Sequence, residues 1–422
     1  GVLASGSVFK FGCLSQAELA TTLQKDTETA RIIRAVNDLA ITHRDEIDQR
    51  FPKIQRRVAG YNLDELGLRN GFNLAGLLVG SEGTLAINTE ARVQLVRKPK
   101  HAVLGVCHFK TFSDSMHASA SIVTLEPHAI ELSDKLLIDL ARESPLHRDK
   151  LHFVHGNPEA LLIVEFAGEE LGQLNKKLDH LSVLMRDLGF GDNVVRVTEP
   201  VRCAEVWAVR KAGLGLLGSV RGGAKPVAFV EDTAVAPEQL PEFTAAFREV
   251  LNRYGVRAAF YGHASVGCLH VRPMLDLRKA EDVGKYRAIA EEVTELTMKF
   301  GGTHSGEHGE GLARSEFNPK VFGKTLYAAF REVKAAFDPH GRMNPGKKVD
   351  APPMDKNLRY GAAYTTTFPV PILDYAEFGG MDSAIEMCNG NGRCRKSEVG
   401  TMCPSYMVTL DEMHSTRGRA NA

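Results

Sequence analysis

The stretch "HAVLGVCHFKTFSDSMHASASIVTL" (101–125) passes from a run typical of a buried strand to a pattern typical of an amphipathic helix. The same change recurs further along the chain. "LLIVEFAG" (161–168) and "KPVAFVEDTAV" (225–235) are predicted to be buried strands. Residues 171–188 and 237–254 are predicted to be amphipathic helices between and after them. Strands that alternate with helices in this way predict an α/β or α+β domain.

The segments on either side of this region carry patterns of their own. Residues 15–50 are predicted to be helical, because Ser15 and Glu18 match a capping box and apolar residues recur at helical spacing. The alternation in "ARVQLV" (91–96) predicts a strand. Near the other end, an apolar pattern predicts a helix that Pro339 stops.

Composition excludes several classes of partner. The chain has 422 residues, and its 52 Lys and Arg residues balance 52 Asp and Glu residues. This balance gives no electrostatic reason to expect a nucleic acid or an anionic membrane as partner. No apolar run approaches the roughly 18–20 residues that span a bilayer. The seven cysteines are an odd number and are mostly scattered, which favours a reducing, cytoplasmic compartment.

Histidines gather in two glycine-rich segments, "YGHASVGCLH" (261–270) and "SGEHGEG" (305–311). The glycines of the first segment interrupt a helix, so a loop that leads into a strand is expected to fold His263 back beside His270. Two imidazoles and one carboxylate with open positions suit Zn²⁺ or Mn²⁺. Such an ion would polarise a substrate hydroxyl, and a neutral imidazole could accept its proton. The alternative is that each histidine is a hydrogen-bonded structural residue.

Glu307 and His308 are neighbours in the second segment. On an extended backbone, adjacent side chains point to opposite sides. One of the two is therefore expected to face the metal and the other the substrate.

Four motifs in this order resemble the FAD-linked oxidases of the vanillyl-alcohol oxidase superfamily and, within it, the D-2-hydroxyacid dehydrogenases. They are "GSEGTL" (80–85), "YGHASVGCLH" (261–270), "SGEHGEG" (305–311) and "NPGK" (344–347). The resemblance covers about residues 50–350. It implies that His263, His270 and Glu307 bind the divalent metal. It also implies that His308 is the base that takes the proton of the substrate hydroxyl.

The resemblance implies an α+β fold in three parts. Residues 1–98 would be the remaining part of a PCMH-type FAD-binding domain. Residues 99–350 would form a ferredoxin-like α+β cap domain that holds substrate and metal. Residues 351–422 would be a proline-rich linker and the start of an α-helical domain of the [4Fe–4S] ferredoxin type. No pyrophosphate-binding glycine loop precedes residue 80 and the chain lacks an initiator Met, so an internal piece truncated at both ends is expected.

The flavin is expected at "GSEGTLAI" (80–87), where Gly80 and Gly83 lack Cβ atoms and let the backbone approach a cofactor closely. An ordinary turn is the alternative. In the resembled family this loop contacts FAD through its backbone, and the asparagine before "PGK" lies near the flavin. The implied FAD-binding residues are Gly80, Ser81, Gly83, Thr84, Ile87 and Asn344.

Cations for the substrate are expected in residues 206–232, where Arg210 and Lys225 flank a glycine-rich segment. Arg offers a planar fork for a carboxylate and Lys a point charge. A solvated surface loop is the alternative. The resemblance implies that both residues contact substrate carboxylates. This chain has Leu214 where the D-2-hydroxyglutarate enzymes have Thr, and Arg272 where they have Asn, and the extra arginine could serve a second carboxylate.

Three cysteines gather near the C-terminal end as C-x5-C-x8-C-P: Cys388, Cys394 and Cys403. Ferredoxin runs read C-x2-C-x2-C-x3-C-P, so the spacing differs. Unrelated cysteines or a small zinc site are the alternatives. The segments "CPSY" and "STRGRAN" resemble the start of the iron–sulfur module fused to bacterial FAD-linked hydroxyacid dehydrogenases. They imply a [4Fe–4S] cluster whose fourth ligand is expected beyond Ala422.

The expected function is an FAD-dependent dehydrogenase that oxidises D-2-hydroxyglutarate to 2-oxoglutarate, with electrons leaving through iron–sulfur centres. No G-x-G-x-x-G after a strand suggests a nicotinamide site, so a quinone, flavoprotein or cytochrome is the expected acceptor. The enzyme could associate with a membrane through this acceptor, and it could form a homo-oligomer. D-lactate or glycolate dehydrogenase is one alternative. A non-catalytic electron-transfer subunit is another, against which the retention of both histidines and the Glu-His pair argues.

Overall fold

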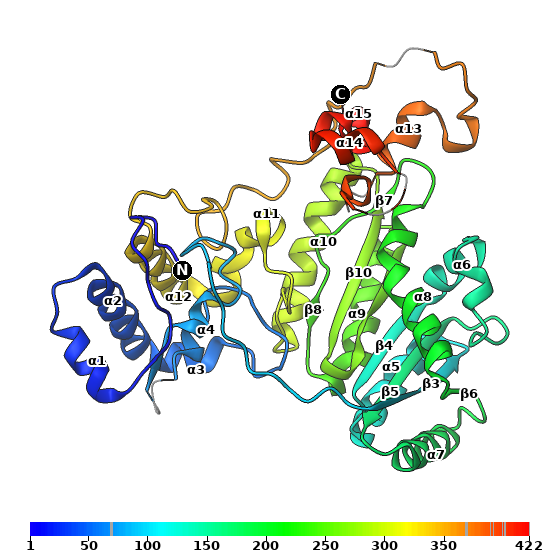
Figure 1. Ribbon diagram of the computed structural model, residues 1–422, viewed down its shortest axis with the longest axis horizontal. Helices are drawn as coiled ribbons and strands as arrows, with labels where there is room; N and C mark the ends of the chain where they lie inside the picture. Colours follow the sequence, from blue (N-terminus) through cyan, green and yellow to red (C-terminus); the bar gives the residue numbers. More distant parts are fainter. Residues whose placement is uncertain are drawn as a thin grey trace.

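The computed structural model describes residues 1–67, 71–367, 370–388, 390, 392–398, 400 and 402–421. An antiparallel sheet forms the centre of its larger part, with the neighbours β6-β3-β5-β4-β9-β10-β7 and with β8 also paired to β10 (Figure 1). All of these pairs are antiparallel. The strands are β3 (His101–Phe109), β4 (Ala129–Asp134), β5 (Ala160–Gly168), β6 (Val194–Val197), β7 (Lys225–Pro226), β8 (Thr233–Ala234), β9 (Ala258–His263) and β10 (Cys268–Leu275).

Helices cover both faces of this sheet because alternate strand residues are apolar on either side. The side chains of Val103 and Cys107 pack toward one layer, and those of Leu104 and Val106 pack toward the other. The first layer holds α5 (Phe112–Ile122), α7 (Leu171–Asp187), α9 (Leu240–Arg253) and α10 (Ala280–Lys299). The second layer holds α6 (Lys135–Glu143) and α8 (Pro200–Gly218). The α+β class expected from the sequence is confirmed.

The strand predicted over 225–235 is mostly wrong. Only β7 and β8, of two residues each, form within it, and the residues between them leave the sheet. Asp232 has a left-handed backbone, with φ of 51°. Its buried carboxylate pairs with Arg314 outside the sheet, and Glu231 pairs with the side chain of Arg272, so polar contacts override the apolar strand pattern here.

The smaller part of the molecule has a separate core, built from residues 3–86 together with residues 322–349. Its elements are β1 (Cys13–Leu14), α1 (Gln16–Leu23), α2 (Glu28–Thr42), α3 (Arg44–Arg50), β2 (Phe72–Asn73), α4 (Ala75–Leu78) and α12 (Asn318–Phe337). The short helix α11 (Gly311–Arg314) precedes α12, and its Ala313 packs against the core of the sheet domain. The predicted helices over 15–50 are confirmed, and the Ser15–Glu18 capping box is present. The last long helix, α12, therefore packs on the N-terminal part although the sheet domain precedes it in sequence.

The strand predicted in "ARVQLV" is absent. Residues 91–96 are all exposed and pair with no strand in the described part of the chain. Alternation alone does not make a strand, since a strand also needs a neighbour to take its backbone hydrogen bonds. In Figure 1 this segment runs between the two parts of the molecule.

The C-terminal segment holds α13 (Met381–Glu386), α14 (Pro404–Thr409) and α15 (Thr416–Asn421), close to β7 and α10 in Figure 1. An ion pair between Arg278 Nη1 and Glu386 Oε2 at 3.0 Å ties α13 to the residues after β10. Among the described residues, no helix has both the length and the apolar character needed to span a lipid bilayer.

Asp134 joins β4, α6 and β9. One carboxylate oxygen accepts the N–H of Leu137 at 3.1 Å and caps α6, and the other accepts the N–H of Phe260 at 2.7 Å. Burial raises the pKa of Asp134 to about 7, although these backbone donors oppose the rise.

This raised pKa predicts a specific dependence of stability on pH. The folded protein holds the proton of Asp134 more tightly than the unfolded chain does. The free energy of unfolding should therefore fall as pH rises from about 4 to about 7. Asp134→Asn should lose this dependence, so the difference between parent and variant should change by roughly 2–4 kcal/mol over that window. Urea denaturation at several pH values measures it, and parallel pH profiles for the two proteins would contradict it.

Candidate active site

The β9–β10 hairpin brings the two predicted histidines together. Tyr261 of β9 lies opposite His270 of β10, and His263 lies opposite Cys268 at the turn. His263 Nε2 is 3.4 Å from His270 Nε2. Gly262 allows this close pairing, because a Cβ there would lie 2.6 Å from the carbonyl oxygen of Cys268. The loop-and-strand arrangement expected from the sequence is therefore confirmed.

Glu307 is the point on which three imidazoles converge. Its Oε1 lies 3.3 Å from Nε2 of His263, 3.3 Å from Nε2 of His270 and 3.4 Å from Nε2 of His308. Its Oε2 lies 3.4 Å from Nη1 of Arg56, which comes from the smaller part of the molecule. These hydrogen bonds hold the pKa of Glu307 far below its usual range.

The expectation that Glu307 and His308 face opposite sides is wrong. The backbone N–H groups of both residues donate to the same oxygen of Asp232, each at 2.8 Å. This curl of the backbone turns both side chains toward one cluster. The ring of His308 stacks on that of His270, with centroids 4.9 Å apart and planes 5° from parallel.

The donor set fits a divalent cation. Ligand atoms of His263, His270 and Glu307 all lie within 4.8 Å of one another, as do those of Glu231, His270 and His308. Two imidazoles and a carboxylate are the donors that Zn²⁺ and similar ions take in open sites. The cluster combines residues from the hairpin and from the segment at 305–311, which is the combination expected from the sequence.

Two carboxylates that were not predicted from the sequence, those of Glu131 and Glu231, orient His263 and His308. Glu131 of β4 accepts a hydrogen bond from Nδ1 of His263 at 2.6 Å, and this contact with that to Glu307 raises the pKa of His263 to about 9. Glu231 lies 3.2 Å from Nδ1 of His308 and, together with Glu307, raises the pKa of His308 to about 10. In both rings Nδ1 is held by an acid and Nε2 is aimed at the cluster.

His270 differs from the other two imidazoles. It is buried, and burial lowers its pKa despite the hydrogen bond to Glu307. The cluster therefore contains one imidazole biased toward the neutral form, which is the form that binds metals.

The two predicted substrate arginines lie beside this cluster and share its orienting acids. Arg210 Nη2 lies 2.6 Å from Glu131, and the guanidinium carbon is 5.2 Å from the ring centre of Tyr261. Arg272 pairs with Glu231. Each guanidinium thus already has a carboxylate partner, and the two acids connect the arginines to His263 and His308.

Lys225 stands apart from these arginines. It lies in β7, paired with Leu275 at the far end of β10, and its Nζ donates to the carbonyl oxygen of Val220 at 2.9 Å. Partial burial lowers its pKa. None of the side-chain contacts described for Lys225 reaches the histidine cluster.

The predicted flavin loop contacts the segment that carries Glu307. The carboxylate of Glu82 accepts the N–H groups of Glu310 and Gly311 at 2.8 and 3.0 Å. Asn344 Nδ2 donates to the carbonyl oxygen of Glu82 at 2.7 Å. The structure therefore brings "GSEGTL", "SGEHGEG" and "NPGK" together. Glu82 itself was not singled out by the sequence reasoning.

The loop residues do different things. Gly80 packs against protein, because a Cβ there would lie 3.0 Å from Cβ of Val58. Gly83 has φ of 68° and faces open space, which suits close approach of a cofactor. Of the remaining predicted residues, Ser81 and Thr84 are buried, and Thr84 Oγ1 bonds the carbonyl oxygen of Ser81 and the hydroxyl of Tyr61, both at 2.7 Å.

Ile87 closes the loop. Its backbone exchanges hydrogen bonds with Val2 at 2.8 and 2.9 Å, and its side chain is 61% exposed. Among the predicted flavin-binding residues of this loop, Gly83 best fits an adjacent cofactor, because a Cβ there would meet no other atom.

The three C-terminal cysteines are free thiols. Cys388 and Cys394 are half-buried, and Cys403 is buried. The Sγ of Cys403 accepts the N–H of Thr416 at 3.1 Å. Three thiols in one segment, one of them already accepting a backbone N–H, supply part of the thiolate set that an iron–sulfur cluster takes.

Several known proteins are similar to this chain in sequence. The family model described as "FAD linked oxidases, C-terminal domain" matches residues 98–348. The D-2-hydroxyglutarate dehydrogenase of Escherichia coli (strain K12) is 35% identical, over 96% of this chain and 41% of that protein. Glycolate oxidase subunit GlcD of the same strain is 27% identical, over 73% of this chain and 60% of that protein. A solved alkyldihydroxyacetonephosphate synthase is 18% identical with a TM-score of 0.45, over 66% of this chain and 51% of that one.

Proposed function

Because this chain belongs to the FAD-linked oxidases with the C-terminal domain of that family, we propose that it is the substrate-binding and metal-binding part of a D-2-hydroxyacid dehydrogenase. The chain spans about two fifths of the length of the D-2-hydroxyglutarate dehydrogenases that it matches. The observation that carries the proposal is the convergence of three imidazoles on Glu307.

We propose that His263, His270 and Glu307 hold a divalent cation, Zn²⁺ or Mn²⁺. The chemistry that such an ion supplies when bound is Lewis acidity toward a substrate oxygen. Residues 80–87 and Asn344 would contact FAD, which when bound supplies the acceptor for a hydride. The support for the flavin contact is the open face of Gly83 and the hydrogen bond from Asn344 to Glu82.

His308 is proposed to take the hydroxyl proton at Nε2. Its Nδ1 faces Glu231, which fixes the orientation of the ring and leaves Nε2 directed into the cluster. The hydrogen bonds to Glu231 and to Glu307 favour the imidazolium form of His308. A cation held by Glu307 would occupy one of these two acceptors and place a positive charge near the ring, and both effects would lower the pKa of His308.

The substrate would be a dicarboxylate, D-2-hydroxyglutarate, with 2-oxoglutarate as product. The D-2-hydroxyglutarate dehydrogenases that match this chain at 33–35% identity support this choice. The cations around the cluster also support it. Arg210 and Arg272 would meet one carboxylate near the histidines, and Lys225 would meet the other. One proton then leaves the hydroxyl for His308 and one hydride leaves the carbon, which balances the oxidation.

Cys388, Cys394 and Cys403 are proposed as three of the four ligands of a [4Fe–4S] cluster. When bound, this cluster supplies one-electron transfer toward an acceptor such as a quinone, flavoprotein or cytochrome. The free thiols in one segment support this part of the proposal.

A monocarboxylate such as D-lactate or glycolate is the second candidate substrate. It is favoured by one observation: Arg210 and Arg272 already pair with Glu131 and Glu231. Charge for a second carboxylate then depends on Lys225. The two substrate classes therefore differ in their dependence on this lysine.

Turnover of the full-length enzyme distinguishes them. We expect kcat/KM for D-2-hydroxyglutarate to exceed that for D-lactate by at least about tenfold. We expect Lys225→Met to lower the first value by about tenfold or more and to leave the second nearly unchanged, since one charged hydrogen bond is lost. The exposed Lys211 of α8 provides the matched control, Lys211→Met. Equal efficiency on both acids, or an equal loss on both in Lys225→Met, would exclude the dicarboxylate preference.

A further inference from the structure

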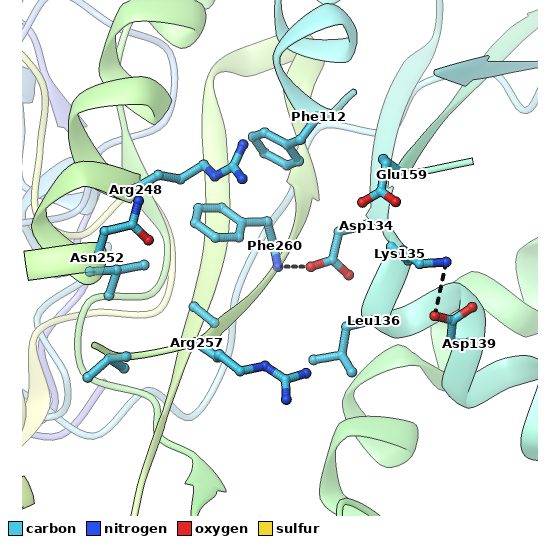
Figure 2. Close-up of a pocket in the computed structure, with 13 residues that line it drawn as sticks. Phe112, Asp134, Lys135, Leu136, Asp139, Glu159, Arg248, Asn252, Arg257 and Phe260 are labelled. Carbon is cyan, nitrogen blue, oxygen red and sulfur yellow. Dashed lines mark hydrogen bonds and ion pairs between the residues drawn. The ribbon is translucent and has the colours of Figure 1, made fainter. Parts of the chain in front are cut away.

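A cavity of about 380 Å³ lies at the edge of the sheet domain, between the first turn of α6, the start of β9, and α9 (Figure 2). Its size falls within the range of about 300–1,000 Å³ that small-molecule sites have. Phe260 lines it and belongs to the core on the α5 and α9 side, whereas Tyr261 packs on the opposite, α8 side. The histidine cluster shares the face of Tyr261, so the cavity is separate from the proposed active site.

Two arginines of this cavity lack a carboxylate partner. Arg248 lies over the ring of Phe112, with its guanidinium carbon 5.3 Å from the centroid. Within the described part of the chain, neither Arg248 nor Arg257 forms an ion pair or a side-chain hydrogen bond. The arginines around the proposed active site, Arg210 and Arg272, are both paired. Two unpaired guanidinium groups on one cavity therefore offer donors that the protein itself does not use.

The other charged groups of the cavity are mostly neutralised. Lys135 and Asp139 pair with each other at 3.3 Å. Both carboxylate oxygens of Asp134 accept backbone N–H groups, and burial raises its pKa to about 7. Glu159 is exposed, and no side-chain partner is described for it. Among the described charged side chains of the cavity, Arg248, Arg257 and Glu159 are therefore the ones without a hydrogen-bond or ion-pair partner.

The positions of the two arginines favour a ligand that carries two separate acidic groups. Figure 2 shows Arg248 and Arg257 on opposite sides of Phe260, so one compact anion would not be centred on both. Phe260 lies between them, and Phe112 and Leu251 add apolar surface to the lining of the cavity. We propose that this cavity binds a small linear dicarboxylate, with one carboxylate on each arginine and the carbon chain over the apolar side chains. Binding here does not require that the dehydrogenase proposal be correct.

Calorimetric titration of the full-length protein with glutarate tests this proposal. We expect Arg248→Gln/Arg257→Gln to weaken glutarate binding at the cavity by at least about tenfold, because charged hydrogen bonds are lost. Turnover on a 2-hydroxyacid should be unchanged in this variant. Arg210→Gln, which alters the proposed active site, should retain binding at the cavity.

Two further measurements sharpen the test. Glu159→Gln should bind glutarate at least as tightly as the parent, since it removes the one opposing charge. The neutral diamide glutaramide should not bind measurably. The proposal is overturned if parent and double-arginine variant bind glutarate equally, if Arg210→Gln abolishes all binding, or if glutaramide binds as tightly as glutarate.

Discussion

Glu307→Gln is expected to abolish binding of the proposed divalent metal and to lower kcat/KM of the full-length enzyme by at least about 10³, since Lewis-acid stabilisation contributes several kcal/mol. One oxygen of Glu307 is the common partner of three imidazoles. Glutamine keeps the size of the side chain but replaces the anionic oxygen with a neutral one, which is a much poorer ligand for a divalent ion. Elemental analysis of the purified protein and steady-state turnover measure the two effects.

The matched control is Glu281→Gln, because Glu281 is exposed on α10 and, within the described residues, pairs with Lys285 of the same helix and no other cation. This variant should keep full metal content and turnover. His263→Ala should resemble Glu307→Gln in both measurements. If Glu307→Gln retained the metal and turned over within twofold of the parent, the metal role of this carboxylate would be wrong. Full activity after chelation of the metal would exclude the Lewis-acid role.

The sheet and its covering helices were predictable where one periodicity ran without interruption. The strand over 101–109 and the helices over 171–188 and 237–254 formed as expected, because their apolar residues had a core to face. The pattern failed over 225–235, where Glu231 and Asp232 divide the apolar run and pair with the distant arginines Arg272 and Arg314. A run of residues does not reveal which of its polar members will find a distant partner.

The centre of the candidate site was predictable for a chemical reason. Imidazoles and a carboxylate that gather in glycine-rich segments indicated a metal site, and the family resemblance then implied His263, His270 and Glu307 as its ligands. The acids that orient them could not, since Glu131 lies 132 residues from His263 in sequence. Its one signal is its position as a charged residue between the apolar residues Ile130 and Leu132 of β4. Such a residue needs a partner, but the sequence does not say which one.

A buried ion pair connects the proposed flavin loop to the segment that carries Glu307, the proposed metal ligand. Lys348 and Glu310 are both fully buried and paired with each other, and Lys348 Nζ also lies 3.2 Å from Glu82. Glu310 accepts the N–H of Gly60 at 2.6 Å, and Lys348 donates to the carbonyl oxygen of Val58 at 2.9 Å. The segments at residues 58–60, 82, 310 and 348 therefore meet at this ion pair. Glu310 is only three residues after Glu307 in the sequence.

Lys348→Met is expected to lower the free energy of unfolding by about 3–5 kcal/mol, because it leaves a buried carboxylate without its cation. Lys348→Met/Glu310→Gln should recover part of this loss, since glutamine is neutral and can still accept the N–H of Gly60. Lys320 is exposed and pairs with Glu295 on the surface, so Lys320→Met should change the value by less than about 1 kcal/mol. Urea denaturation of the full-length protein compares the three variants. Equal stabilities for Lys348→Met and Lys320→Met would show that burial of this pair does not hold the two loops together.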